Sequence, residues 1–321
     1  MKQRTKVDLN YFPGWTRKSL SFSIDDGKLE FDRKFIEIVK PVGIRGTFNL
    51  CDTTKATAQE YRELYEGFEI ANHCKHHPRA ADDGIKFIIS DNELDRDGGE
   101  NYTAERPVVY KTTVEGVYYC HPEWAAARPG GWFTIADAEY YIKYVDEAKR
   151  ELEAVFGEGR VRGFVWPFYK QYNSQVREHL VSSGYYGTRS SGDVLDKTGF
   201  ALPTDWIDWS YNACDKTMLA LMEKYEEYPD DGELKFFCLG VHSRDYEVRN
   251  KWDALREFAQ KYGNRPNDYF YATNAEIYDY QAAVNSARIT DGEIINESGL
   301  PLYAKIGGEK IIIHSKSIYK I

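Results

Sequence analysis

Apolar residues are spaced along the first eighty positions in a way that predicts strands alternating with helices. Short apolar runs have the length of buried strands, and the segments between them repeat apolar residues near the 3.6-residue period of a helix. The expected strands are residues 19–24, 47–50 and 68–71, and the expected helices are residues 31–39 and 58–65. Because strands joined by helices run parallel, this order indicates a parallel sheet with right-handed crossovers.

The same alternation returns in the second half of the chain, after a stretch that interrupts it. The expected helices there are residues 135–156, 174–183, 216–226 and 275–287, and the expected strands are residues 161–166 and 234–241. Residues 85–132 hold short runs broken by Asp, Gly and Pro, which we interpret as an insertion of antiparallel hairpins. Short Ile- and Leu-rich runs predict a small C-terminal β appendage. We therefore expect an α/β body with a sheet of parallel strands over residues 1–287 and the appendage over residues 288–321.

The composition is that of a globular protein and argues against two classes of partner. Of the 321 residues, 42% are hydrophobic and 29% charged, and the formal net charge is -9. Binding to nucleic acid and polybasic attachment to a membrane both depend on clustered Lys and Arg, so we expect neither partner. Phe, Trp and Tyr make up 15% of the chain. Part of this aromatic surplus must fill the core, and the rest is compatible with a carbohydrate ligand.

The cysteines and the first residues favour a cytoplasmic protein. The five cysteines form no CxxC pair and no regular spacing, which is typical of reduced, mostly buried thiols. Residues 1–10 contain no apolar segment of the secretory kind, and no run approaches the roughly 20 apolar residues that span a bilayer. We expect a cytoplasmic location, or an extracellular one if a leader precedes this sequence. No heptad repeat indicates an oligomeric state.

Acidic and histidine residues follow three of the expected strands, at the edge where parallel α/β folds carry their active sites. Asp25 and Asp26 end the first strand, His73 and His77 follow the third, and His242 follows the last. On a helical turn, the spacing of His73 and His77 directs both imidazoles to one side, where they and a carboxylate could bind zinc. The alternative is a solvated turn and a helix N-cap with no metal.

Three segments taken together resemble a known family. The runs SFSIDDG, VGIRGTFNL and EIANHCKHHP are similar to motifs of the polysaccharide deacetylase family, carbohydrate esterase family 4, which shares the NodB-homology domain. The similarity is close over residues 18–78 and looser to about residue 246. It implies a distorted (β/α)7 barrel and a metal-dependent hydrolase that removes N- or O-linked acetyl groups from a carbohydrate or polysaccharide.

The resemblance implies a metal site at the first two motifs. Asp26, His73 and His77 correspond to the ligands of a divalent metal, with Zn²⁺ expected ahead of Co²⁺, Ni²⁺ or Mn²⁺. His76 stands at a position that is not a ligand in the family, so we expect a structural role for it. Cys74 replaces the usual Ser or Thr and loses a hydroxyl hydrogen bond.

The resemblance also implies the groups that move protons. Asp25 corresponds to the general base and His242 to the general acid. Asp208, in the segment DWIDW, corresponds to the carboxylate that tunes the acid. The backbone N–H of Phe168 corresponds to a donor for the oxyanion that forms at the acetyl carbon.

The sequence departs from the family pattern at Val165. The family commonly carries an arginine there, which orients the base. Either another cation takes this role, or Asp25 is held less firmly and activity is lower. The candidate cations are Arg79, Arg128, Lys170 and Arg189.

Four tryptophans are candidates for stacking on a sugar ring, namely Trp124, Trp132, Trp166 and Trp209. The first two lie in the expected insertion, where packing of a small core is the favoured explanation. Two functions compete with the deacetylase. One is a carbohydrate-binding relative that keeps the metal site without turnover, and the other is a hydrolase of a non-sugar amide on the same fold.

Overall fold

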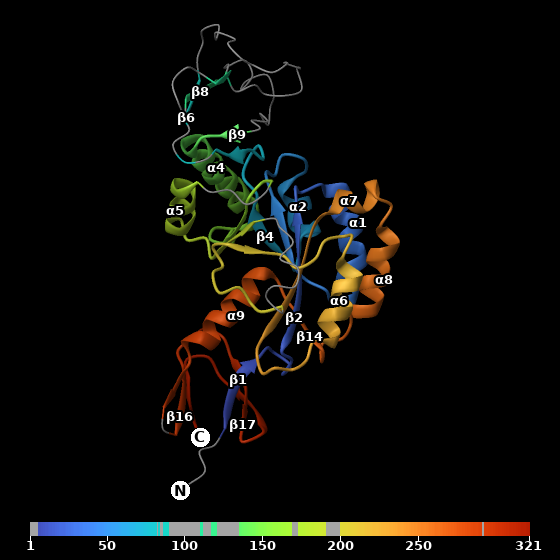
Figure 1. Cartoon of the computed structure of the whole chain (residues 1–321), viewed down its shortest axis with the longest axis vertical. Helices are drawn as coiled ribbons and strands as arrows, with labels where there is room; N and C mark the ends of the chain where they lie inside the picture. The colour runs from blue at the N-terminus through green and yellow to red at the C-terminus, as the bar shows by residue number, and fades with distance from the viewer. Residues whose placement is uncertain are drawn as a thin grey trace.

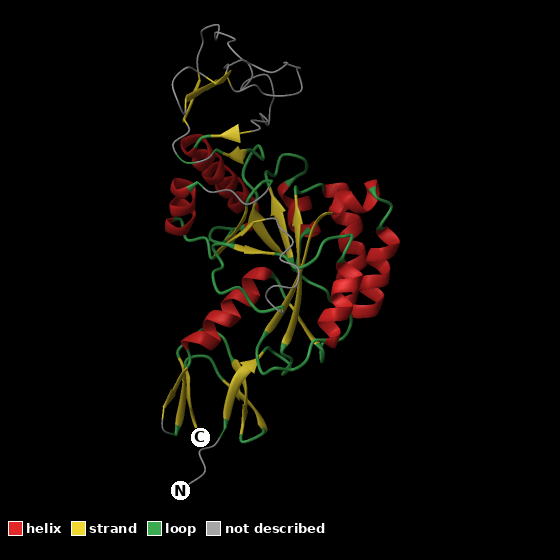
Figure 2. Ribbon diagram, viewed as in Figure 1, coloured by secondary structure: helices red, strands yellow, loops and turns green. Residues whose placement is uncertain are grey.

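A curved parallel sheet surrounded by helices forms the body of the molecule (Figures 1 and 2). The computed structural model describes residues 6–81, 83, 86–89, 110–111, 117–120, 135–168, 173–190, 200–290 and 292–321. The main path of the sheet has the order β12-β11-β10-β4-β3-β2-β13, and β14 pairs with the start of β2. The strands are β2 Lys18–Asp25, β3 Thr47–Leu50, β4 Glu69–Asn72, β10 Gly163–Val165, β11 Gly187–Ser190, β12 Trp209–Ser210, β13 Lys235–His242 and β14 Tyr269–Tyr271.

The sheet curls until its two outer strands meet. The chain that follows β12 bridges to β13 in a parallel sense, through Ala213 and Leu239. The N–H of Asn212 donates to the carbonyl of Cys238 at 3.0 Å, and the N–H of Gly240 donates to the carbonyl of Ala213 at 2.8 Å. The expected distorted (β/α)7 barrel is confirmed.

Helices cover the outside of this barrel. They are α1 Leu29–Val39, α2 Ala58–Leu64, α4 Ala138–Phe156, α5 Ser174–Ser182, α6 Met218–Glu227, α7 Ser243–Val248, α8 Trp252–Tyr262 and α9 Asn274–Ser286. In Figure 1, α1, α6, α7 and α8 lie together on one side of the sheet, and α4 and α5 lie on the other. None of the described helices combines the length and the apolar composition needed to cross a bilayer.

Local signals fix where several helices begin. Thr57 forms a capping box with Glu60 at the start of α2, and Thr273 forms another with Glu276 at the start of α9. The side chain of Asp137 accepts from the backbone at the start of α4. These helices begin within three residues of the expected positions, whereas β1, β11, β14, α7 and α8 were not predicted.

The core between α1 and the sheet is a cluster of aromatic rings. Phe22 on β2 contacts Phe35 on α1 and Phe48 on β3 edge to face, with ring centroids 5.0 and 5.3 Å apart. Gly46 precedes β3 because a Cβ there would meet the Phe22 ring and carbonyl at 2.5–2.6 Å. This tight packing holds β2 and β3 side by side below the end of the barrel that carries the candidate site.

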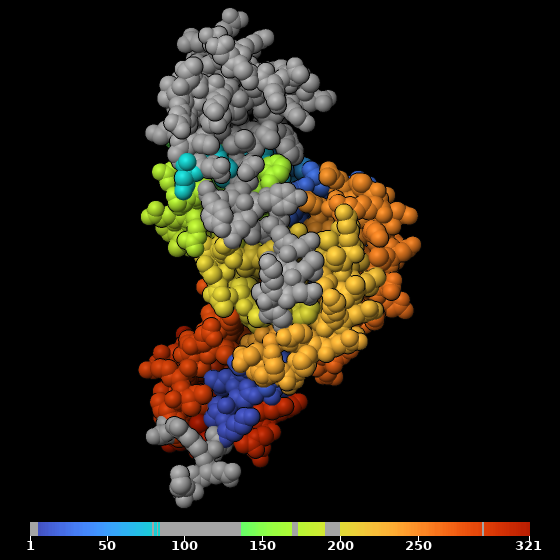
Figure 3. Space-filling view, viewed as in Figure 1, coloured from blue at the N-terminus to red at the C-terminus, as the bar shows by residue number. Residues whose placement is uncertain are grey.

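Both ends of the chain contribute to the small sheets at one end of the molecule. β1 (Val7–Tyr11) pairs with β17 (Leu302–Ile306), which pairs with β18 (Glu309–Ile313). A second sheet contains β15 (Arg288–Thr290), β16 (Glu293–Asn296) and β19 (Ser317–Lys320). In Figure 3 the blue surface of the N-terminal residues lies among the red and orange surface of the C-terminal ones. The expected division at residue 287 therefore leaves out β1, which we had assigned to the barrel.

The expected insertion at residues 85–132 lies mostly outside the described residues. Within it, β6 (Lys86–Ile89) pairs with β8 (Val117–Cys120) in parallel, and β7 (Tyr110–Lys111) pairs with β8 in antiparallel fashion. β5 (Arg79–Ala80) pairs in parallel with β9 (Ile135–Ala136). Of the two pairings described within residues 85–132, one thus has the expected antiparallel sense and the other is parallel, while the β5–β9 pairing lies at the borders of this segment.

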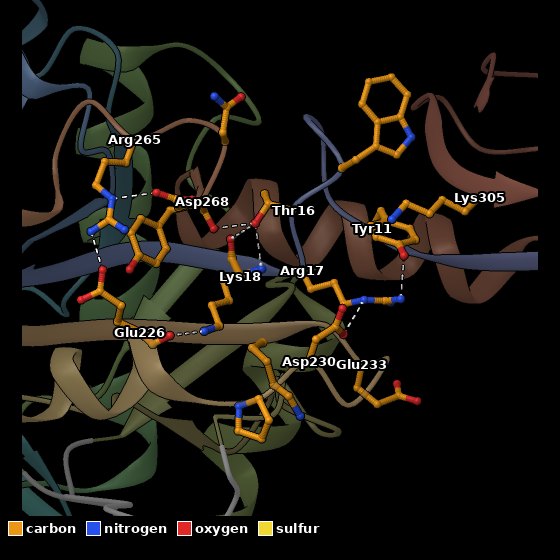
Figure 4. A pocket seen from close by; sticks show the side chains of 15 residues that line it. Tyr11, Thr16, Arg17, Lys18, Glu226, Asp230, Glu233, Arg265, Asp268 and Lys305 are labelled. Carbon is orange, nitrogen blue, oxygen red and sulfur yellow. Dashed lines mark hydrogen bonds and ion pairs between the residues drawn. The ribbon is translucent and has the colours of Figure 1, made fainter. Parts of the chain in front are cut away.

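A cavity of about 300 Å³ lies where the barrel meets the appendage, near the start of β2 and β13 (Figure 4). Its charged groups are largely paired with one another. Arg17 contacts Asp230 at 2.8 Å, Arg265 contacts Asp268 at 2.7 Å, and Lys18 donates to a backbone carbonyl of α6 at 2.7 Å. These contacts join the first strand of the barrel to the segments on either side of it.

One buried carboxyl group links three parts of the fold. The hydroxyl of Tyr65 donates to Asp32 Oδ2 at 2.6 Å, and the hydroxyl of Ser243 donates to Asp32 Oδ1 at 2.5 Å. Asp32 lies on α1, Tyr65 follows α2 and Ser243 follows β13, so these contacts hold the three segments together. Burial raises the pKa of Asp32 to about 7, and the negative charge of Asp26 acts in the same direction, against the two hydrogen bonds.

The raised pKa of Asp32 makes stability depend on pH. Between about pH 4 and pH 7 the folded state binds the Asp32 proton and the unfolded state does not, so this group lowers the free energy of unfolding as pH rises. One full proton corresponds to a slope of about 1.4 kcal/mol per pH unit. We expect Asp32→Asn to remove this part of the slope in urea unfolding measured across that range. Asp253→Asn, at a side chain 99% exposed, should leave the slope unchanged. Equal slopes in Asp32→Asn and the unaltered protein would contradict the assignment.

Candidate active site

Polar side chains from several strands meet at the carboxyl end of the barrel. Asp25 at the end of β2 is in register with Asn49 on β3 and with His242 on β13. Val165 on β10 is in register with Arg189 on β11. Because paired residues of neighbouring parallel strands point to the same face, this level of the barrel collects the candidate groups.

The Asp25-Asp26 pair ends β2 at a sharp turn. Asp26 has a φ of +79°, in the left-handed region that non-glycine residues rarely adopt, and Gly27 follows with a φ of +59°. Asp25 continues the strand, while Asp26 has left it. Asp26 thereby reaches the cavity beside its neighbour instead of pointing to the opposite face.

His73 and His77 approach each other through a turn. The chain after β4 contains no helix here, and Cys74, His76 and His77 have φ values of +57°, +66° and +50°. The N–H of His77 donates to the carbonyl of Cys74 at 3.1 Å, and the rings of His73 and His77 are 4.8 Å apart. The expected helical turn was wrong, although the two imidazoles do lie together. His76 points elsewhere and packs edge-on against Tyr144 of α4.

Two imidazole nitrogens converge on one carboxylate oxygen. Nε2 of His73 lies 3.6 Å and Nε2 of His77 lies 3.5 Å from Oδ1 of Asp26, and this buried oxygen accepts no hydrogen bond among the described residues. Ligands of one tetrahedral zinc ion are about 3.4 Å apart, because each lies about 2.1 Å from the metal. The spacing is too long for good hydrogen bonds and fits three ligands of a common ion. Asp26, His73 and His77 therefore form a candidate site for a divalent metal.

The electrostatics of these residues suit a cation. Burial and the neighbouring His73 lower the pKa of His77 to about 4, so its imidazole is neutral at neutral pH, as a metal ligand must be. Burial opposes ionisation of Asp26, but its contacts with the histidines hold its pKa well below the usual range. Nδ1 of His73 lies 2.8 Å from the carbonyl oxygen of Val165, which leaves Nε2 directed at Asp26.

Arg189 supplies the cation that Val165 lacks. A guanidinium N–H of Arg189 donates to Oδ1 of Asp25, and the Asn49 amide donates to the same oxygen at 2.7 Å. Arg189 is 1% exposed, and burial and this charge act oppositely on Asp25, whose pKa is lowered overall. Of the other candidates, Arg128 and Lys170 lie outside the described residues, as does the side chain of Arg79.

The carboxylate beside His242 is Asp245, not Asp208. Nδ1 of His242 lies 3.2 Å from Oδ2 of Asp245, which in turn lies 3.4 Å from Arg249. Arg249 also contacts the buried Asp215 at 2.7 Å. Asp208 is exposed and precedes β12, away from the end of that strand that faces the cavity. Burial lowers the pKa of His242, but the hydrogen bond to Asp245 and the charges of nearby aspartates raise it to about 9.

These groups line a cavity of about 670 Å³, a volume typical of small-ligand sites. Trp166 and Phe168 contribute to its wall, and the Phe168 ring lies 4.8 Å from the ring of His77. Tyr211 also lines it, below the guanidinium of Arg189.

The other tryptophan candidates do not line this cavity in the described structure. Trp209 is buried in the core against Trp206 and Phe236, so its expected place in the substrate cleft was wrong. Trp124 and Trp132 lie outside the described residues.

Sequence reasoning missed three residues of the site. Asn49, Asp245 and Arg249 belong to no motif that we recognised. A polar residue inside the apolar run 47–50 was a signal for the first, and the acid three residues after His242 was a signal for the second. Arg249 offered no comparable signal.

Comparison with known proteins identifies the family. Residues 15–188 match the model of a family described as polysaccharide deacetylase. The matched segment includes Asp25, Asp26, His73 and His77, and ends one residue before Arg189. A comparison with curated proteins finds no match.

Three solved structures are similar to this chain at low sequence identity. A putative polysaccharide deacetylase from Mycobacterium smegmatis is 14% identical, with 90% of this chain and 98% of that chain covered and a TM-score of 0.51. The peptidoglycan deacetylase PdaC from Bacillus subtilis is 13% identical, with 84% and 95% covered and a TM-score of 0.43. A family 4 carbohydrate esterase from Streptomyces lividans, in complex with acetate, is 12% identical, with 76% and 86% covered and a TM-score of 0.38. On the family match, which spans more than half of its length, this chain belongs to the polysaccharide deacetylase family.

Proposed function

We propose that this protein is a metal-dependent deacetylase that removes N- or O-linked acetyl groups from a carbohydrate. The observation that carries the proposal is the convergence of His73 and His77 on one oxygen of Asp26. Two further contacts lie beside this cluster. Arg189 contacts the carboxylate of Asp25, and the carboxylate of Asp245 contacts His242. A base, an acid and a metal site around one cavity are the groups that hydrolysis of an amide or ester needs.

Asp26, His73 and His77 would hold the metal, and we propose zinc. Two imidazoles and a carboxylate are a common ligand set of catalytic zinc sites, with a position left open for substrate or water. The ion, when bound, polarises the acetyl carbonyl and activates water for attack.

Asp25 accepts the proton of the attacking water. Arg189 and Asn49 both donate to Oδ1, which fixes the carboxylate and leaves Oδ2 for the incoming proton. Since its pKa is lowered, Asp25 is ionised at neutral pH and ready to act as a base. This ion pair favours the enzyme over the alternative of a binding protein without turnover, because that alternative followed from the loss of an arginine at Val165.

His242 donates a proton to the departing nitrogen or oxygen of the sugar. With a pKa raised to about 9, it carries that proton at neutral pH. Asp245 holds Nδ1, so Nε2 faces the cavity, 3.9 Å from Asp26. We propose the backbone N–H of Phe168, beside His77, as a donor to the oxyanion.

Metal content and acetate release test this function together. We expect about one equivalent of zinc per chain, and loss of acetate release when a chelator removes it. Asp25→Asn should keep the metal and lower kcat about 10²- to 10⁴-fold on acetylated oligosaccharides, because it removes the base alone. A panel that includes acetylated non-sugar amides separates the remaining alternative. Retention of full activity in Asp25→Asn, or activity without metal, would refute the mechanism.

Arg189 and Val165 allow an exchange experiment. Arg189→Met should leave Asp25 as an unpaired buried charge and destabilise the protein by about 3–5 kcal/mol. The double variant Asp25→Asn/Arg189→Met should regain stability but not activity. The variant Val165→Arg/Arg189→Met returns the cation to the neighbouring strand at the same level, and we expect it to recover part of kcat. Thermal unfolding measures the change in stability, and acetate release measures kcat. An unchanged kcat in Arg189→Met alone would show that Arg189 does not hold the base.

Substitutions of Asp245 and of Asp208 should have different effects on His242, the proposed acid. Asp245→Asn removes the carboxylate that raises the pKa of His242, so the fall in activity at high pH should move to lower pH by about one unit or more. The sign follows because His242 must be protonated to act, and a lower pKa makes it lose its proton sooner as pH rises. Asp208→Asn should leave the profile in place. The pH dependence of kcat decides between them, and a shift in Asp208→Asn alone would restore the role that the resemblance implied.

A further inference from the structure

Cations line the cavity beside the proposed acid. Lys28 follows β2, Arg244 follows β13, and Lys216 lies on the loop that follows β12, and all three contribute to the wall. Lys28 is half-buried, and Lys216 and Arg244 are exposed. Arg249 and four aspartates line the same cavity, so its basic and acidic residues balance, in a chain whose net charge is -9.

These three cations have no ion pair within the described part of the chain. The acids of the same cavity already have partners, since Asp25 contacts Arg189 and Asp26 belongs to the candidate metal site. Asp215 contacts Arg249, and Asp245 contacts both Arg249 and His242. The carboxylates of the cavity are therefore engaged, and among the described residues none of them forms an ion pair with Lys28, Lys216 or Arg244. The charge of Arg244 does help to lower the pKa of the adjacent Asp245.

The cavity between barrel and appendage provides a comparison within the same molecule. There Arg17 contacts Asp8 and Asp230, and Arg265 contacts Glu226 and Asp268, at 2.6–2.8 Å. Figure 4 draws the contacts with Asp230, Glu226 and Asp268, and the contact of Lys18 with a backbone carbonyl. The arginines of this cavity are thus paired with acids, whereas its Lys18 and Lys305, like Lys28, Lys216 and Arg244 of the other cavity, form no ion pair among the described residues. Charges that line a cleft in this way attract a ligand of opposite sign.

The position of the three cations indicates which part of a substrate would meet them. All three flank His242, since Lys28 follows the strand beside β13, Lys216 follows the segment that bridges to β13, and Arg244 is two residues further along the chain. His242 is the group proposed to protonate the sugar as it leaves. The cations therefore face the sugar rather than the acetyl group.

We propose that the substrate is an acetylated sugar with a negatively charged substituent, a carboxylate or sulfate, held by Lys28, Lys216 and Arg244. This inference rests on the proposed deacetylation and names the class of sugar. A neutral sugar would leave three charges at the mouth without a counterpart. An anionic sugar would form ion pairs with these cations, and the attraction between them would weaken as the salt concentration increases.

Binding to an inactive protein tests this inference separately from turnover. The zinc-loaded Asp25→Asn protein is titrated by calorimetry with three methyl glycosides: N-acetylgalactosaminuronic acid, N-acetylgalactosamine and its 6-sulfate. The first two differ only by a carboxylate in place of a hydroxymethyl group, and the third distinguishes sulfate from carboxylate. We expect at least one charged sugar to bind about tenfold more tightly than the neutral one at low salt, and this preference to shrink as salt is added.

Substitutions then assign the preference to residues. In the same background, Lys28→Gln, Lys216→Gln and Arg244→Gln should each weaken binding of the charged sugar by up to about fivefold, and that of the neutral sugar by less. Lys320→Gln, at an exposed position on β19, is the matched control and should change neither.

The possible outcomes test the anionic substrate and the proposed deacetylase function separately. Equal affinity for charged and neutral sugars, binding of none of them, or a preference that survives all three substitutions overturns the anionic substrate. If the unaltered protein still releases acetate, the proposed function stands without it. A charge preference that depends on these cations, in a protein that releases no acetate from any sugar, supports the anionic ligand and refutes the deacetylase.

Discussion

The Asp25 carboxylate is buried among strands at the end of the barrel, where an isolated charge is costly, and Arg189 is the cation that makes this position tenable. In the sheet, β11 and β2 are separated by β10, β4 and β3. The two side chains nevertheless touch, because the sheet curls and brings β11 across the interior to face β2. The ion pair depends on the curvature of the barrel, and the proposed base depends on the ion pair. Since desolvation of both charges offsets their attraction, its main effect is on the state and orientation of Asp25 and less on stability.

The same geometry explains why a valine can stand where the family pattern has an arginine. Val165 and Arg189 are register partners on adjacent strands, so both face the interior at one level. Moving the cation by one strand changes its direction of approach to Asp25 but keeps its distance short enough for a hydrogen bond. Sequence spacing gave four candidate cations and no means to choose among them, because it contains no information about which strands face each other across a barrel. The alternation of apolar runs, by contrast, was sufficient to predict most of the strands and helices of the barrel, because burial on both faces imposes that pattern locally.

In the candidate site, too, features set by the local sequence were predictable, and contacts between distant segments were not. The strand ends at Asp25 and at His242 were predictable, because apolar runs stop there. The partner of His242 was not, since Asp245, three residues after His242, and Asp208, just before β12, are equally plausible until α7 is placed. Lys28, Lys216 and Arg244 are ordinary basic residues in the sequence, and only the closure of β12 against β13 brings them to one mouth.

His73 and His77 reach the metal site through a backbone that is unfavourable by itself. Left-handed conformations at non-glycine residues cost of order 1 kcal/mol each and persist only where the surroundings enforce them. The surroundings here centre on Asn72, a fully buried residue at the end of β4. Its side-chain oxygen accepts from the N–H of Cys74 at 2.8 Å, and its amide donates to the carbonyl of Val145 on α4 and to the hydroxyl of Tyr185. The hydrogen bonds of this amide thus tie the turn to α4 and to Tyr185, which follows α5, so segments on the outside of the barrel help to determine where the two imidazoles lie. Asn72 therefore supports the candidate metal site, although its side chain forms no hydrogen bond with Asp26, His73 or His77.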